Sequence, residues 1–392
     1  MKLAHITLAT LVVAATSCQS NPPPELPSSH IAEAPASEIE SVIYLVGDVG
    51  DAIWERSPLP HRLAAEVEAW SGRLARDSAV AVIFLGDNSY PKGLRMEPLY
   101  FAADSAHLQA QADVFAGRNA RAYKAFGLFI AGNHDWGHMP GNAGEARLRN
   151  QEQFFARRRA QGVRVELMPK AGAPGPGAVN VGRRIKILLL DTAWWLLSAD
   201  REEKARTMGR LTQQMVAARQ EGRAIIMVAH HPLKSASVHG GMISLTSAFG
   251  IKWFLYKSGA ALQDLNSLPY RDFRDQLAAA FAPAGPPLIF AGGHDHSLQI
   301  MRAVDDKEPR YMLVSGAGSK SSNVGRKEGM LYRSSEPGFM RLIIKKDGGV
   351  DLFVFTAPTE YLMCPPGTPV EEQTCISKGT AEFQSRYSLT LR

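Results

Sequence analysis

The chain has few cysteines and no long apolar run beyond its N-terminus. Only three of its 392 residues are cysteine, and after residue 15 no stretch is long and apolar enough to span a bilayer. It shows no internal repeats. A net charge of +6 is small for this length, and the arginines within 146–161 are interpreted as a solvated helix face. No nucleic-acid partner is therefore expected. An apolar content of 45% excludes global disorder.

The N-terminus is typical of a targeting segment. Lys2 precedes an uncharged, mostly apolar stretch, 3–15. The last residue of this stretch begins the sequence Ala-Thr-Ser-Cys at 15–18. These residues resemble the lipobox of bacterial lipoproteins, although Ala15 stands where Leu is usual. We expect a signal peptide over 1–17 and an exported protein, periplasmic or at the outer membrane. A lipid on Cys18 would hold it to the membrane. The alternative is an ordinary secretory signal with an incidental cysteine.

Three further regions are expected after the signal. Residues 18–40 are rich in proline, alanine, serine and glutamate, which predicts an extended linker. A single catalytic domain is expected over 41–357, and a C-terminal extension over 358–392. In that extension Cys364 and Cys375 are interpreted as a disulfide of an oxidising compartment. The alternative is a pair of free buried thiols.

Apolar strand-like runs alternate with amphipathic stretches from residue 41 onward. This order predicts an α/β domain with sheets inside and helices outside. Strands are expected at 42–46, 80–85, 128–131, 185–190, 224–229, 288–291, 311–314, 340–344 and 351–355. Helices are expected at 63–74, 98–116, 146–161, 201–221 and 272–281.

Polar residues cluster directly after five of these expected strands. In open α/β sheets such positions form ligand sites, because the carboxyl ends of the strands meet there. Each cluster alone is weak evidence, since a single Asp or His is often structural, but five in order are hard to assign to chance. The clusters are Gly47-Asp48-Val49-Gly50, Gly86-Asp87-Asn88-Ser89-Tyr90, Gly132-Asn133-His134-Asp135, His230-His231-Pro232 and Gly293-His294-Asp295-His296.

The residue types in these clusters suit first-row metal ions. Asp, Asn and His supply oxygen and nitrogen donors, and the absence of cysteine argues against a structural zinc site. A carboxylate such as Asp87 can bridge two cations, and a pair of cations can clamp a phosphate ester. No organic cofactor is expected.

In order and spacing the five motifs resemble those of the calcineurin-like metallophosphoesterases. Within that superfamily they most resemble the purple acid phosphatases, especially the small tartrate-resistant type. The resemblance extends from about residue 42 to 355. It implies a four-layer α/β/β/α sandwich and a binuclear metal centre.

Two positions favour the purple subgroup. Most metallophosphoesterases have a metal-binding His where this chain has Gly50, so one donor is missing. Tyr90, three residues after Asp87, would supply a phenolate in its place. Phenolate is a hard anionic donor suited to Fe(III). The resemblance therefore implies Fe(III) plus a divalent ion, which would be Fe, Zn or Mn.

The resemblance also implies a role for each matching residue. Fe(III) would be held by Asp48, Tyr90 and His296, the second ion by Asn133, His230 and His294, and Asp87 would bridge them. The catalytic histidines would be His134 and His239. Neighbouring Asp135 and Asp295 would orient imidazole rings. His138 and His231 receive no role.

The expected reaction is acid-phosphatase-like hydrolysis of a small phosphomonoester, with a metal-bound hydroxide attacking phosphorus. Activity should favour acidic pH, because Fe(III) makes bound water more acidic. One alternative is a phosphodiesterase or pyrophosphatase using Mn or Zn, and another is a non-catalytic surface binding protein. Trp194, Trp195 and the extra segment 247–265 are expected to shape substrate access.

Overall fold

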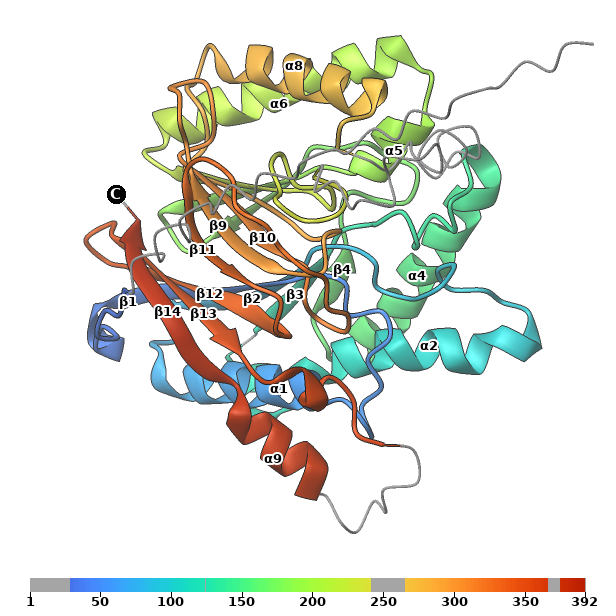
Figure 1. Ribbon diagram of the computed structural model, residues 1–392, viewed down its shortest axis with the longest axis vertical. Coiled ribbons are helices and arrows are strands. Elements are labelled where there is room, and N and C mark those ends of the chain that lie inside the picture. Colours follow the sequence, from blue (N-terminus) through green and yellow to red (C-terminus); the bar gives the residue numbers. More distant parts are fainter. Residues whose placement is uncertain (1–28, 124, 241–264, 366–373, 392) are drawn as a thin grey trace, which may run out of the picture.

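The computed structural model of the chain describes residues 29–123, 125–240, 265–365 and 374–391. The predicted signal peptide, Cys18 and nearly all of the segment 247–265 lie outside these residues. Within the described residues, a pair of sheets lie face to face, and helices cover the outer side of each (Figure 1). This four-layer α/β/β/α arrangement confirms the predicted fold class.

The first sheet has the strand order β14-β13-β12-β1-β2-β3-β4. Strands β1 to β4 are parallel, and β12 to β14 continue the sheet antiparallel. The bounds are β1 (Ile39–Val46), β2 (Ala79–Phe84), β3 (Phe126–Phe129), β4 (Val165–Leu167), β12 (Gly338–Lys345), β13 (Val350–Thr356) and β14 (Gln384–Leu391). In β1, Val42 and Tyr44 face the helices, whereas Ile43 and Leu45 face the second sheet. Both faces are buried, which explains the continuous apolar run.

The second sheet has the order β11-β9-β10-β8-β7-β6-β5. Its central strands β6, β7, β8 and β10 are parallel. The bounds are β5 (Gly177–Val181), β6 (Ile185–Leu189), β7 (Ala224–Val228), β8 (Ile289–Gly292), β9 (Leu298–Arg302), β10 (Tyr311–Ser315) and β11 (Met330–Ser334). Ile226 and Val228 of β7 pack against the first sheet in the central core.

Two groups of helices form the outer layers (Figure 1). Beside the first sheet lie α1 (Pro58–Arg73), α2 (Pro98–Ala112), α3 (Arg118–Ala122), α4 (Gly141–Ala160) and α9 (Thr374–Glu382). Beside the second lie α5 (Thr192–Leu197), α6 (Arg201–Gln220) and α8 (Leu268–Phe281). Short 3-10 helices occupy Ala36–Glu38, Asp113–Phe115 and Thr359–Tyr361. None of the described helices has the length and apolarity needed to cross a membrane.

The predicted linker is not a free tether from residue 29 onward. The Ser388 amide donates to the Ser29 carbonyl, and the Ile31 amide donates to Ser388 Oγ at 2.8 Å. Glu33 forms an ion pair with Arg341 of β12. β1 also begins inside the predicted linker. These contacts correct the expected boundary at residue 40, because this polar segment finds hydrogen-bond and charge partners on the first sheet.

The C-terminal extension is built into the fold. Cys364 and Cys375 are joined by a disulfide, which confirms the predicted pairing. Helix α9, which contains Cys375, packs against α1, and β14 forms the edge of the first sheet. The extension is therefore a structural component of this sheet in the described residues.

Candidate metal centre

The predicted ligand residues meet at one edge of the two sheets. Asp48 follows β1, Asp87 follows β2 and Asn133 follows β3 in the first sheet. His230 follows β7 and His294 follows β8 in the second. All five strands are in parallel pairs within their sheets, so their carboxyl ends point to the same edge.

One side of the site is formed by a carboxylate, a phenol and an imidazole. The Tyr90 hydroxyl donates to Asp48 Oδ1 at 3.0 Å and lies 3.4 Å from His296 Nε2. His296 Nε2 lies 3.5 Å from the same Asp48 oxygen. The three residues expected to hold Fe(III) are therefore in direct contact.

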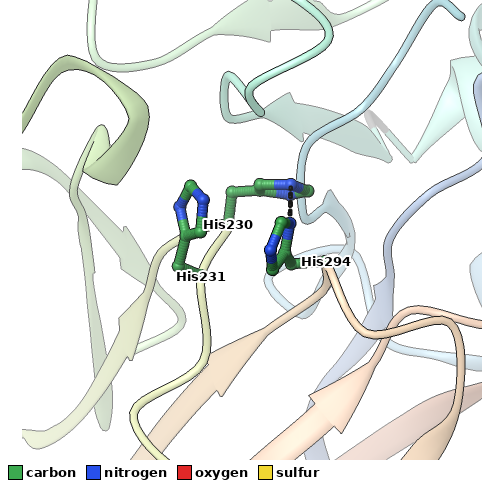
Figure 2. A group of neighbouring side chains, drawn as sticks. All are labelled: His230, His231 and His294. Atoms are coloured by element: carbon green, nitrogen blue, oxygen red, sulfur yellow. Dashed lines mark hydrogen bonds between the residues drawn. The ribbon is translucent and has the colours of Figure 1, made fainter. Parts of the chain in front are cut away.

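The other side is centred on His230. Its Nε2 lies 3.0 Å from Asn133 Oδ1 and 3.3 Å from His294 Nδ1, the contact drawn in Figure 2. It also lies 3.4 Å from Asp87 Oδ1. Donor atoms of Asp48, Asp87 and His230 all lie within 4.8 Å of one another. Asp87 thus stands where the two sides meet.

His231 points to a different place from His230 (Figure 2). Its Nδ1 is 2.8 Å from Thr192 Oγ1, and its backbone amide donates to the same oxygen. A donor atom of His231 still lies within 4.8 Å of donors of His230 and His294. Thr192 is thus a positioning residue that the sequence analysis missed, although Leu-Asp-Thr directly follows β6.

The backbone is strained at several predicted ligands. Among the described non-glycine residues, φ is positive at Asp48 (59°), Asp87 (55°), His138 (57°) and His294 (65°). L-residues rarely adopt this region, and such strain persists where the surroundings impose it. At three of these positions it turns a donor side chain toward the centre.

Gly50 leaves room for the rest of the site. A Cβ at this position would lie 2.5 Å from the Asp87 carbonyl oxygen, 2.8 Å from the Ser89 amide and 2.9 Å from Tyr90 Cδ2. The Tyr90 ring and the backbone beside it therefore occupy the space a side chain would need. The absence of a side chain at 50 and the presence of the phenol at 90 belong to one packing arrangement.

We expect Gly50→His to destabilise the fold rather than restore a ligand. The new side chain would overlap backbone atoms, and such overpacking costs about 3 kcal/mol. Urea unfolding should show the loss. Gly209→His is the matched control, because nothing lies within 4 Å of a Cβ there. Equal stability of the two variants would contradict this account.

The electrostatics of the site suit bound cations. Asp48 and Asp87 are 0% and 1% exposed, and buried carboxylates need compensating positive charge. Among the described residues their ion-pair partners are histidines alone. Burial, and then Asp48 and Asp87, raise the pKa of Tyr90 well above its ordinary value. A cation between these groups would offset both carboxylates and so remove some of that shift.

The imidazoles differ in charge. Burial and the neighbouring histidines lower the pKa of His294 well below its usual range, so its ring is neutral and able to bind a metal. Burial lowers the pKa of His230 as well, but Asp87 and Asp48 outweigh it and raise the pKa overall. His230 is therefore the ring from which a cation beside Asp87 would displace a proton.

Comparison with known proteins bears on the fold. No family model matches the sequence, and no curated protein is significantly similar to it. GAP50, the anchor in the inner membrane complex of Plasmodium, is 14% identical with a TM-score of 0.53, over 91% of this chain and 89% of that one. Purple acid phosphatase PPD1 from yellow lupin seeds is 14% identical with a TM-score of 0.52, over 91% of this chain and 54% of that one. A dimetal phosphatase from Danio rerio is 10% identical with a TM-score of 0.46, over 90% and 99%.

The chain has a metallophosphoesterase-like fold. It spans about half the length of the lupin phosphatase. At these identities the likeness concerns the arrangement of the elements, whereas the activity has to be argued from the site itself.

Asp135 supports the candidate metal centre in a way the sequence analysis did not foresee. It accepts hydrogen bonds from the backbone amides of Gly132, Asn88 and Ser89 and from the Gln151 side chain. It therefore ties the two ligand loops together, and the expectation that it orients an imidazole is wrong. Burial, then the charge of Asp87, raises the pKa of Asp135 to about 7.

The same correction applies to Asp295. Its Oδ1 accepts a hydrogen bond from the backbone amide of His239 at 3.1 Å, not from a ring. Asp191 forms a comparable link, since it accepts from Trp136 Nε1 at 2.9 Å and caps α5 through the Trp194 amide. These carboxylates hold loops in place because loop amides need buried acceptors.

The two predicted catalytic histidines flank the site. The His134 ring packs on Tyr90 at 4.5 Å, and its Nε2 lies 3.9 Å from Asp87 Oδ2. The His239 ring lies 4.2 Å from that of His294. His138, which had no assigned role, places Nε2 3.2 Å from His134 Nδ1. The four-residue spacing between His134 and His138 was the sequence signal that could have predicted this contact.

Proposed function

We propose that this protein is a two-metal hydrolase of phosphomonoesters. The observation that carries the proposal is the meeting of two buried carboxylates, a phenol, an amide and three imidazoles at one sheet edge. Asp48, Tyr90 and His296 would hold Fe(III), Asn133, His230 and His294 a divalent ion, and Asp87 would contact both. When bound, the two cations would polarise the phosphate and supply a nucleophilic water.

The chain's own residues would position the ester and move protons. His134 Nδ1 lies 2.7 Å from the Pro91 carbonyl oxygen, so a proton on this nitrogen is held there. A second proton on Nε2 would then be available to the departing alcohol. His239 stands beside His294, where it would contact a phosphate oxygen. Asp135 would keep the ligand loops in register during turnover.

The direct test is hydrolysis of p-nitrophenyl phosphate by the metal-loaded chain. We expect release of p-nitrophenolate, favoured at acidic pH, with nearly all activity lost after chelation and recovered when iron plus zinc is returned. Chelation should abolish turnover because the metals supply both the nucleophile and charge stabilisation. Activity that is unaffected by chelation would contradict the proposal.

The same assay separates the alternatives. A Mn or Zn phosphodiesterase would prefer bis(p-nitrophenyl) phosphate, and a pyrophosphatase would prefer inorganic pyrophosphate. A non-catalytic binding protein would cleave none of these esters. The intact donor set argues for catalysis, because a scaffold kept only for binding has no need to bury carboxylates at the centre.

We also propose that the protein is exported and anchored by lipid on Cys18. The disulfide between Cys364 and Cys375 supports export, since such bonds persist in oxidising compartments. Mass spectrometry of the N-terminal peptide from membranes would show acylation of Cys18 if the proposal holds.

A further inference from the structure

Lys320 lies at the edge of the candidate metal centre. Its ammonium stands 3.2 Å above the centre of the Tyr90 ring, whose hydroxyl contacts Asp48 and His296. A cation over an aromatic face is attracted by the ring's negative π-surface. The ammonium is therefore held close to the Tyr90 hydroxyl, and so close to the atoms that would bind the metals.

The loop that carries Lys320 is anchored on both sides of it. Ser319 Oγ donates to the Asp48 carbonyl at 2.5 Å, and it accepts from the Asp51 amide at 3.2 Å. The Ser322 amide donates to the His296 carbonyl at 2.7 Å. Lys320 is thus presented by a loop fixed to two ligand-bearing segments, so its position over the ring is built into the fold.

The ammonium keeps capacity to bind another anion. It pairs with Asp51 Oδ2 at 3.3 Å, and the two side chains are 32% and 39% exposed. Exposed ion pairs of this kind are weak and exchange readily. A lysine has three donor hydrogens, and lysine commonly binds phosphate as a point charge. Asp51 and the Tyr90 ring leave a donor for a further oxygen.

We propose that Lys320 binds a non-bridging oxygen of the substrate phosphate and favours monoesters over diesters. This inference rests on the proposed function. A monoester dianion carries two negative charges and a diester only one. A cation beside the metal pair therefore stabilises the bound monoester more than the bound diester. The half-buried position of Lys320 at the surface lets its side chain leave Asp51 and turn to the phosphate without disturbing the core.

The test compares Lys320→Gln and Lys320→Arg with the metal-loaded wild type. For Lys320→Gln we expect kcat/KM for p-nitrophenyl phosphate to fall by about tenfold, the scale of one charged hydrogen bond. The kcat/KM for bis(p-nitrophenyl) phosphate should change by less than about twofold, since the diester carries less negative charge for the Lys320 ammonium to attract. Lys320→Arg should recover most of the loss. Lys307→Gln is the matched control, because Lys307 is exposed in the β9–β10 loop.

A second measurement does not depend on turnover. Calorimetric titration with inorganic phosphate should show weaker binding for Lys320→Gln than for the wild type and Lys320→Arg. If the wild type hydrolyses neither ester, the proposed function fails, and this titration alone decides the role of Lys320. Equal losses for both esters, an unchanged phosphate affinity, or no phosphate binding by the wild type would overturn the inference.

Discussion

Asn133→Ala and His230→Ala are each expected to reduce kcat/KM for p-nitrophenyl phosphate by about a thousandfold. Asn133 Oδ1 and His230 Nε2 lie 3.0 Å apart on the side expected to hold the divalent ion, so either change removes a donor there. Loss of one cation from a two-metal site removes several kcal/mol of charge stabilisation. Kinetics combined with metal quantification would show a fall in activity together with a fall in bound metal.

Matched controls separate this effect from unfolding. Asn142→Ala and His30→Ala remove the same side-chain types from exposed positions and should keep wild-type activity. Melting followed by circular dichroism should show that the two site variants remain folded, since both changes only remove polar side-chain atoms and leave the apolar core between the sheets intact. Wild-type kinetics in Asn133→Ala and His230→Ala would mean that this cluster does not catalyse the reaction.

Tyr90→Phe is expected to abolish the visible absorption band of the iron-loaded protein. A phenolate bound to Fe(III) gives a charge-transfer band, and phenylalanine has no oxygen to bind. The ring is retained, so packing around Gly50 should survive with a cost of about 1 kcal/mol for the lost hydrogen bond to Asp48. Visible spectroscopy of samples with measured iron content checks this prediction.

Tyr44→Phe provides a close control for this change. Tyr44 is fully buried, and its hydroxyl donates to Glu66 Oε2 at 3.1 Å, beside α1 and away from the ligand cluster. This variant loses an equivalent hydrogen bond and should keep the visible band. A band that persists in Tyr90→Phe would assign the colour to another residue. A colourless and fully active wild type would favour the Mn or Zn alternative.

The central strands could be predicted because a strand that is buried on both faces requires apolar residues at successive positions. Strands such as β1 and β7 match their expected positions within a few residues. β4, β5, β9, β11 and β14 were not predicted. The pattern of β5 alternates between half-buried and exposed residues, and β11 is half-buried throughout, so neither forms an apolar run. β9 directly follows the last ligand motif, where its apolar residues gave no separate signal.

The features of the candidate site likewise divide into those that the sequence predicted and those that it did not. The sequence alone determined which side chains follow the strand ends, and hence the candidate donors. It also showed that Gly50 offers no donor and that Tyr90 offers a phenol. A ligand motif is local, so spacing along the chain carries it. Only the tertiary structure decided that Asp135 binds loop amides, that His231 turns to Thr192, and that Lys320 covers the Tyr90 ring. Those contacts join segments far apart in the chain, and no local pattern encodes the packing that brings them together.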